Sequence, residues 1–135
     1  MKKKIMTMVS GFALLLTAVA LTSATPKDDE VMTKEDGMYV VNTTTLGKNI
    51  TGYVSTTPVK IYIKKNKVVK VEALKNQETP KYFAKVKKGI LDKWNGLKVN
   101  DAQKLKVDGI TGATFSSEAV IQNVQAGLEY YKKNK

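Results

Sequence analysis

The chain has 135 residues and a formal net charge of +11, and it contains no Cys and no His. All 23 basic residues are lysines, because the sequence has no Arg. These absences exclude disulfide frameworks, zinc fingers, His-ligated haem, Cys nucleophiles and Ser-His-Asp triads built from this chain alone. A hydrophobic fraction of 42% in a chain of this length predicts one small globular domain.

The N-terminus has the pattern of an export signal. Lysines at positions 2–4 precede an uncharged stretch, residues 5–26, whose centre is strongly apolar. We expect a cleavable signal peptide over residues 1–24, cleaved after Ala24 or, slightly earlier, after Ala20. An uncleaved membrane anchor is the alternative. Hydroxyl residues that dilute the apolar stretch favour cleavage, and the lack of Cys excludes a lipoprotein. The mature protein is therefore expected outside the cytoplasm, in the periplasm if the cell has two membranes.

The basic balance does not indicate a nucleic-acid partner. The lysines are spread along the whole chain, without Arg forks or interleaved aromatic residues of the kind that read bases. Export also separates the protein from nucleic acid. A solvated surface with a positive field explains most of the lysines and favours anionic ligands.

After the signal, residues 25–37 form a polar, acidic stretch that we expect to be a flexible leader. The folded domain is then residues 38–135, beginning near Met38. A run rich in Tyr, Val and Thr over residues 38–46 predicts a first strand, and residues 50–55 predict a second short one.

The next segment predicts a β-hairpin. Apolar residues alternate with polar ones on both sides of a turn at residues 65–67. The apolar positions are Val59, Ile61 and Ile63 before the turn and Val69, Val71 and Ala73 after it. Because one face of this pair is apolar and the other is polar, the hairpin is expected to pack on a helix or a second layer.

An amphipathic helix is predicted within residues 76–96. Thr79 is its expected N-cap, Pro80 fits the first turn, and Gly96 is the expected stop. Its apolar stripe is Phe83, Val86, Ile90 and Trp94. Residues 97–107, which follow, could hold one more short strand.

A second helix is predicted at the C-terminus, with Ser116 or Ser117 as its cap. Its buried stripe is expected to be Val120, Ile121, Val124, Leu128 and Tyr131. The predicted fold class is therefore α+β, an antiparallel β-sheet with a hairpin, packed against two main helices.

The most informative segment is the loop before the last helix, residues 108–114, with the sequence DGITGAT. Gly109 and Gly112 permit backbone angles closed to other residues, and Ala113 adds little bulk. A phosphate held there would meet backbone N–H donors and the positive end of the helix dipole. A plain strand-to-helix turn with Thr and Ser caps accounts for the same residues, and the spacing matches neither a dinucleotide fingerprint nor a P-loop.

The string DGITGATFSSEAV, residues 108–120, resembles the flavinylation motif of FMN-binding domain proteins. That family includes the C subunit of sodium-pumping NADH:quinone reductase and the G subunit of the Rnf complex. Two further matches precede the motif in the expected order, the pair Gly52-Tyr53 and the triplet Glu78-Thr79-Pro80. The chain departs from the family at Lys81, where a Gly often follows the triplet, and it lacks the long additional sequence of the pump subunits.

The resemblance implies that FMN is joined to the hydroxyl of Thr114 by a phosphoester bond. A separate flavin transferase that uses FAD and magnesium would install it outside the cytoplasm. A threonine hydroxyl is a weak nucleophile unless a base accepts its proton and a metal steadies the phosphoryl group. Because this chain has no His, both are expected mainly from the transferase.

The resemblance also implies the other cofactor-binding residues. Those expected around the phosphate are Gly109, Thr111, Gly112 and Ala113. Ser116 and Ser117 are expected to cap the helix and to bond the ribityl chain or the phosphate. Asp108 would orient the loop, be read by the transferase or form an Asx-turn.

Glu78 and Thr79 would contact the flavin, the alternative being that they only start a helix. Together with the Thr114 loop they are expected to enclose it, because both segments are helix N-termini. The candidates for stacking on the flavin ring are Tyr53, Tyr82 and Trp94, although the core is the expected place of Trp94.

The expected function is an exported electron-transfer flavoprotein, a carrier or redox subunit more than a stand-alone enzyme. Its redox donor and acceptor are unidentified, and membrane-bound complexes could supply them. One alternative is an FMN domain that holds the cofactor without the ester. Another is a flavin-free, basic exported module that binds acidic envelope polymers or a protein partner.

Overall fold

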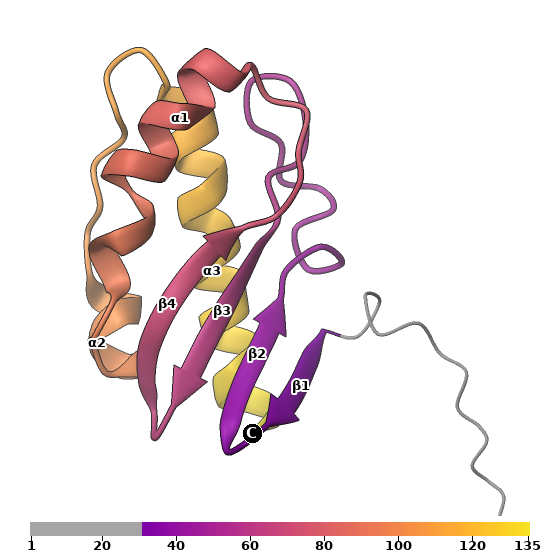
Figure 1. Ribbon diagram of the computed structural model, residues 1–135, viewed down its shortest axis with the longest axis vertical. Helices are drawn as coiled ribbons and strands as arrows, with labels where there is room; N and C mark the ends of the chain where they lie inside the picture. Colours follow the sequence, from indigo (N-terminus) through magenta and orange to yellow (C-terminus); the bar gives the residue numbers. More distant parts are fainter. Residues whose placement is uncertain (1–30) are drawn as a thin grey trace, which may run out of the picture.

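The computed structural model describes residues 31–135, so the predicted signal peptide, residues 1–24, lies outside the described residues. A four-stranded antiparallel sheet in the order β1-β2-β3-β4 comes first, and three α-helices follow it (Figure 1). The strands are β1 (Met32–Glu35), β2 (Met38–Asn42), β3 (Val59–Lys64) and β4 (Lys67–Ala73). The helices are α1 (Pro80–Gly89), α2 (Val99–Lys104) and α3 (Thr114–Asn134), with a short 3₁₀ helix at Leu91–Trp94.

Helix α3 packs across one face of the sheet, against β2 and β3 (Figure 1). The core fills the space between the helices and the sheet. Residues that are fully buried between them are Val41, Val59, Ile61, Ile63, Val86, Ile90, Trp94, Val120, Val124 and Leu128. These come from the alternating strand positions and the helical stripes of the sequence, which is how an α+β domain buries one face of an antiparallel sheet. The predicted fold class is confirmed.

The first hairpin begins earlier than expected. Strand β1 lies inside the segment predicted to be a flexible leader, and it pairs with β2 from Met32↔Val41 to Glu35↔Met38. Asp36 and Gly37 both have positive φ, 53° and 78°, as a two-residue type I′ turn requires. The expectation that the folded part starts near Met38 is therefore wrong, because an Asp-Gly turn returns the chain directly into the sheet.

The second hairpin has the predicted strands with one irregularity. Its turn residues are Lys65 and Asn66, both with positive φ, and the register shifts between Tyr62 and Ile63. This bulge turns Val69 outward, where it is 45% exposed, and places Val68 in the core instead. Strict alternation therefore predicted β3 correctly but placed Val69 on the wrong face.

Helix α1 ends at Gly89, earlier than the stop expected at Gly96, and Ile90 joins it to the 3₁₀ helix. All four apolar residues of the predicted stripe are buried. Thr79 occupies the N-cap position without a side-chain capping bond. Two predicted short strands are absent from the described structure. Residues 50–55 contribute only the isolated bridge Thr51↔Thr56, and part of residues 97–107 forms α2, a helix.

Helix α3 begins at Thr114, two residues before the predicted caps. Ser116 and Ser117 lie in its first turn, so the expectation that they cap it is wrong. Its stripe is buried as predicted, except that Ile121 is half-buried. Among residues 31–135, no helix combines the length and the apolar character needed to cross a bilayer.

Candidate functional site

A pocket of about 340 Å³ lies at the end of the molecule where α1 and α3 begin, the upper end in Figure 1. Three segments that are far apart in the sequence line it. The lining residues are Tyr53, Thr79, Tyr82, Gly112, Ala113, Thr114, Phe115 and Ser116. The structure thus brings the turn at Thr79 and the loop at Thr114 together, as the two helix N-termini led us to expect.

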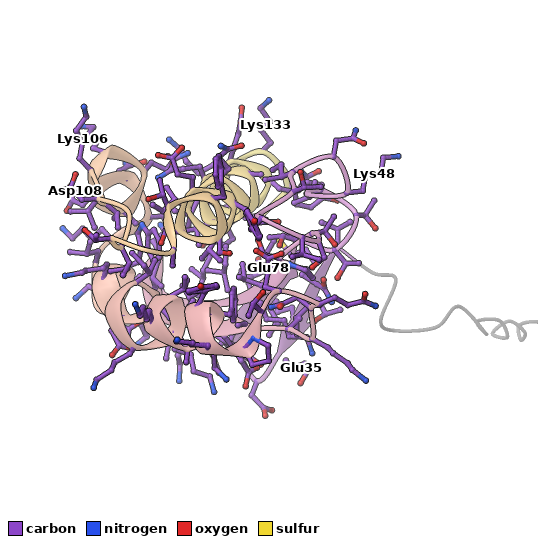
Figure 2. The ribbon with its side chains drawn as sticks, turned by 90° about the horizontal axis from the view of Figure 1, so that it is seen from above. Glu35, Lys48, Glu78, Lys106, Asp108 and Lys133 are labelled. Carbon is purple, nitrogen blue, oxygen red and sulfur yellow. The ribbon has the colours of Figure 1, made fainter. Side chains whose placement is uncertain are left out.

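The carboxylate of Glu78 joins these segments. It is only 4% exposed and lies inside the molecule (Figure 2). It accepts hydrogen bonds from the backbone N–H groups of Tyr53 (2.8 Å), Val54 (2.6 Å) and Ser55 (2.6 Å). The hydroxyl of Ser116 donates to the same carboxylate. Glu78 therefore supports the pocket from beneath instead of lining it.

The hydrogen bonds also set the charge of Glu78. Burial raises the pKa of this carboxyl, but the hydrogen bonds from Ser116 and from the three backbone amides outweigh burial and hold the pKa below its ordinary value. At neutral pH the pocket therefore rests on a buried, ionised carboxylate.

The carboxylate fits because residue 52 is a glycine. A Cβ atom at Gly52 would overlap the nearer carboxylate oxygen of Glu78 and would lie 3.2 Å from the Cα of Ser116. The pair Gly52-Tyr53 thus has a structural reason. Gly52 makes room for the carboxylate, and Tyr53 donates its amide to it.

The Thr114 loop presents free backbone donors to the pocket. Gly112 has a φ of 86°, which few other residues adopt, and the amide of Ala113 closes the turn by donating to Ile110. The next three amides, at Thr114, Phe115 and Ser116, donate to no acceptor among residues 31–135. Unpaired N–H groups at a helix start are suited to bind an anion.

A lysine faces the same loop from α1. The Nζ atom of Lys85 lies 3.4 Å from the position that a Cβ atom on Gly112 would occupy. The sequence could not single out this lysine among the 23 basic residues, because only the packing of α1 beside the loop brings it there. Lys85 thus adds a positive charge beside the turn that precedes the free amides.

Three exposed aromatic side chains surround the pocket. Tyr53 is 69% exposed, Phe115 66% and Tyr82 40%. The rings of Tyr53 and Phe115 stack with centroids 6.2 Å apart and an interplanar angle of 29°. The sequence analysis named Tyr53 and Tyr82 but not Phe115. Phe115 could have been noticed in the sequence, because it is a large apolar residue that lies off the apolar stripe of α3.

Several predicted site residues do not line the pocket. Asp108 is exposed at the outer edge of the molecule, away from Glu78 (Figure 2), and Thr111 is exposed in the turn. Gly109 lies against the Cβ of Ser117 and the methyl group of Thr114, at 3.6 and 3.7 Å from a Cβ placed on it.

Ser117 and Trp94 have structural positions. The Ser117 hydroxyl accepts from the amide of Ile110 (3.1 Å) and donates to the carbonyl of Ala113 (2.7 Å), so it fixes the loop from inside. Trp94 is fully buried in the core, as expected. Ala113 lines the pocket but is itself 6% exposed and packs in the core.

The residues present fit FMN. A phosphate would meet three unpaired amides, with the ammonium of Lys85 near the same loop. A planar ring would meet exposed aromatic side chains, and Thr114, which is exposed, lies in the same pocket lining. Comparison with curated proteins and with solved structures finds no significant match. The family model described as FMN-binding domain matches residues 52–129, more than half of the chain. The match begins at the glycine that accommodates Glu78 and ends within α3. The chain therefore belongs to the FMN-binding domain family.

Proposed function

We propose that the protein is an exported electron-transfer flavoprotein that carries FMN covalently on Thr114. The observation that supports this most is the position of Thr114. It is exposed in the pocket, at the first turn of α3, beside amides that have no acceptor among the described residues. Membership of the FMN-binding domain family adds the identity of the cofactor.

Each part of the site has a task in this proposal. The amides of α3 and the ammonium of Lys85 bind the phosphate, and the aromatic residues contact the ring. The flavin, when bound, accepts and donates one or two electrons. The N-termini of α1 and α3 direct the positive ends of two helix dipoles toward the pocket, which favours a negatively charged reduced ring. A covalent link keeps the cofactor at high effective concentration outside the cytoplasm, where free FMN would diffuse away.

A flavin transferase would make the link from FAD. The Thr114 oxygen bonds to the phosphorus of the FMN half while the pyrophosphate bond breaks, AMP leaves, and the hydroxyl proton passes to a base of the transferase. Magnesium bound by the transferase steadies the phosphoryl group. The exposed loop of residues 108–114 is accessible to such an enzyme, and Asp108 at its outer edge is available for recognition.

The proposal is tested with Thr114→Val, which removes the hydroxyl and keeps nearly the same shape. After co-expression with a flavin transferase, the denatured wild-type band should fluoresce in a gel and the variant band should not. Thr111→Val is the matched control, because it removes a hydroxyl from the same loop outside the pocket lining, and it should keep the fluorescence. Undiminished fluorescence of the Thr114 variant would refute the proposed attachment site.

A further inference from the structure

We propose that Tyr53 and Phe115 form an aromatic clamp that opens to take the isoalloxazine ring between their two faces. The inference rests on the proposed function for the identity of the ring. It goes beyond it by assigning the ring a place, with a separate residue on each side.

The exposure of the two side chains is the first observation. Tyr53 and Phe115 are the two most exposed large hydrophobic residues of the described chain, at 69% and 66%. Neither ring is inserted into the core, and each stacks on the other at the rim of the pocket. Large exposed aromatic surface that serves no packing purpose marks an interaction site.

The geometry of the pair is the second observation. The rings are close to parallel, with an interplanar angle of 29° and centroids 6.2 Å apart. A planar guest between two rings needs their planes roughly 7 Å apart, which is two van der Waals contacts of about 3.5 Å. Exposed side chains change rotamer in picoseconds to nanoseconds, so the two rings can separate rapidly to admit a planar guest.

The anchoring of the two backbones is the third observation. Tyr53 and Phe115 are 62 positions apart in the sequence (115 minus 53), yet one carboxylate holds both segments. Glu78 accepts from the amide of Tyr53 and from the hydroxyl of Ser116, the neighbour of Phe115. The bases of the rings are therefore fixed while the rings themselves remain free, which is the arrangement that a clamp needs.

The proposed attachment at Thr114 would place the flavin next to the two rings. Phe115 follows Thr114 directly, and both line the same pocket. A flavin tethered at Thr114 would therefore stay at high effective concentration beside these rings.

The clamp is tested with lumiflavin, the flavin ring without ribityl phosphate, and with the unloaded full-length protein. Binding is measured by quenching of lumiflavin fluorescence. Tyr53→Leu and Phe115→Leu should each weaken binding about 2- to 10-fold, the range measured for one aromatic stacking contact. Phe115→Tyr, which keeps an aromatic ring, should bind as the wild type does. Tyr62→Leu is the control for loss of a tyrosine on the outer side of the sheet, and it should leave binding unchanged.

The same variants are then compared in the loaded protein, with iodide as a collisional quencher of the attached flavin. A clamp shields both ring faces, so each single variant should increase quenching. If only one of the two positions affects lumiflavin binding and iodide access, the ring is covered on one face and the clamp is refuted. If neither does, the exposed aromatic pair is not a flavin site.

This design separates the clamp from the proposed attachment. Lumiflavin binding by the unloaded protein needs no ester. A negative result in the gel fluorescence test would therefore leave the prediction for lumiflavin binding unchanged. Thermal unfolding of each variant verifies that these exposed substitutions leave the fold unchanged.

Discussion

Glu78 has a carboxylate that is 4% exposed, and it accepts hydrogen bonds from three backbone amides and one hydroxyl. A buried charge is stable only when such donors compensate for lost water. We expect Glu78→Gln to lower the free energy of unfolding by about 2–4 kcal/mol, because the neutral amide weakens charged hydrogen bonds and points an NH₂ group at the donors. Urea unfolding measures the change. Glu118→Gln on the exposed side of α3 is the matched control and should change stability little.

The same residue predicts a dependence on pH. Because the folded pKa of Glu78 is lowered, its stabilisation is complete above the ordinary Glu pKa of about 4.3. It is lost as the pH falls from there through the lowered folded pKa. Unfolding free energies measured over this range should therefore fall more steeply for the wild type than for Glu78→Gln. Parallel curves would show that the carboxylate is not held ionised by its donors.

The packing of α1 brings the ammonium of Lys85 beside Gly112 in the Thr114 loop. Replacing it by Glu reverses a charge beside the phosphate-binding loop and should lower the reduction potential of the loaded protein. The expected shift is on the order of tens of millivolts, corresponding to roughly 1 kcal/mol for charges near a solvated surface. Lys88→Glu makes the same charge change on the same helix and should shift the potential less. Equal shifts would mean that Lys85 acts only through the net charge.

Strand β1 provides a second prediction at this level. A chain beginning at Met38 would lose β1, its pairing with β2 and the partly buried Val31 and Met32. We expect it to be less stable than a chain beginning at Val31 by about 2 kcal/mol, or roughly 10 °C in Tm. Equal melting temperatures for the two chains would show that residues 31–37 do not stabilise the domain, as expected of a flexible leader.

The elements that the sequence predicted well are those with a regular period. The stripe of α1 and the alternation of β3 identify buried positions directly, because burial follows the geometry of each element. The exceptions have local causes. A bulge moves Val69 outward, the turn at Asp36 and Gly37 adds a strand, and α2 forms within residues 97–107, where a short strand was expected.

The site shows a different limit. The motif over residues 108–114 and the triplet at Glu78 could be found in the sequence, since their residue types are distinctive. The buried bond between Glu78 and Ser116, the approach of Lys85 and the pairing of Phe115 with Tyr53 could not, because they arise only when α1, α3 and the Tyr53 loop pack together. Thr111 and Ser117, which the resemblance associated with the phosphate, lie outside the pocket lining.

At the scale of the whole molecule, α1 and α3 begin at the same end of the domain (Figure 1). The free amides of α3 and the exposed aromatic pair belong to the pocket at this end. Export and covalent attachment would make this end a permanent redox centre on a small basic carrier. The proposed attachment concerns the mature protein of the native host, so that form is the one to measure.

The most direct test of the central claim is an intact mass of the protein from its native host, with a fragment spectrum covering residues 108–118. We predict a chain lacking residues 1–24, heavier than its sequence by one FMN less one water, with the added mass on Thr114. An unmodified mature mass, or the same addition on Thr111, Ser116 or Ser117, would contradict the account.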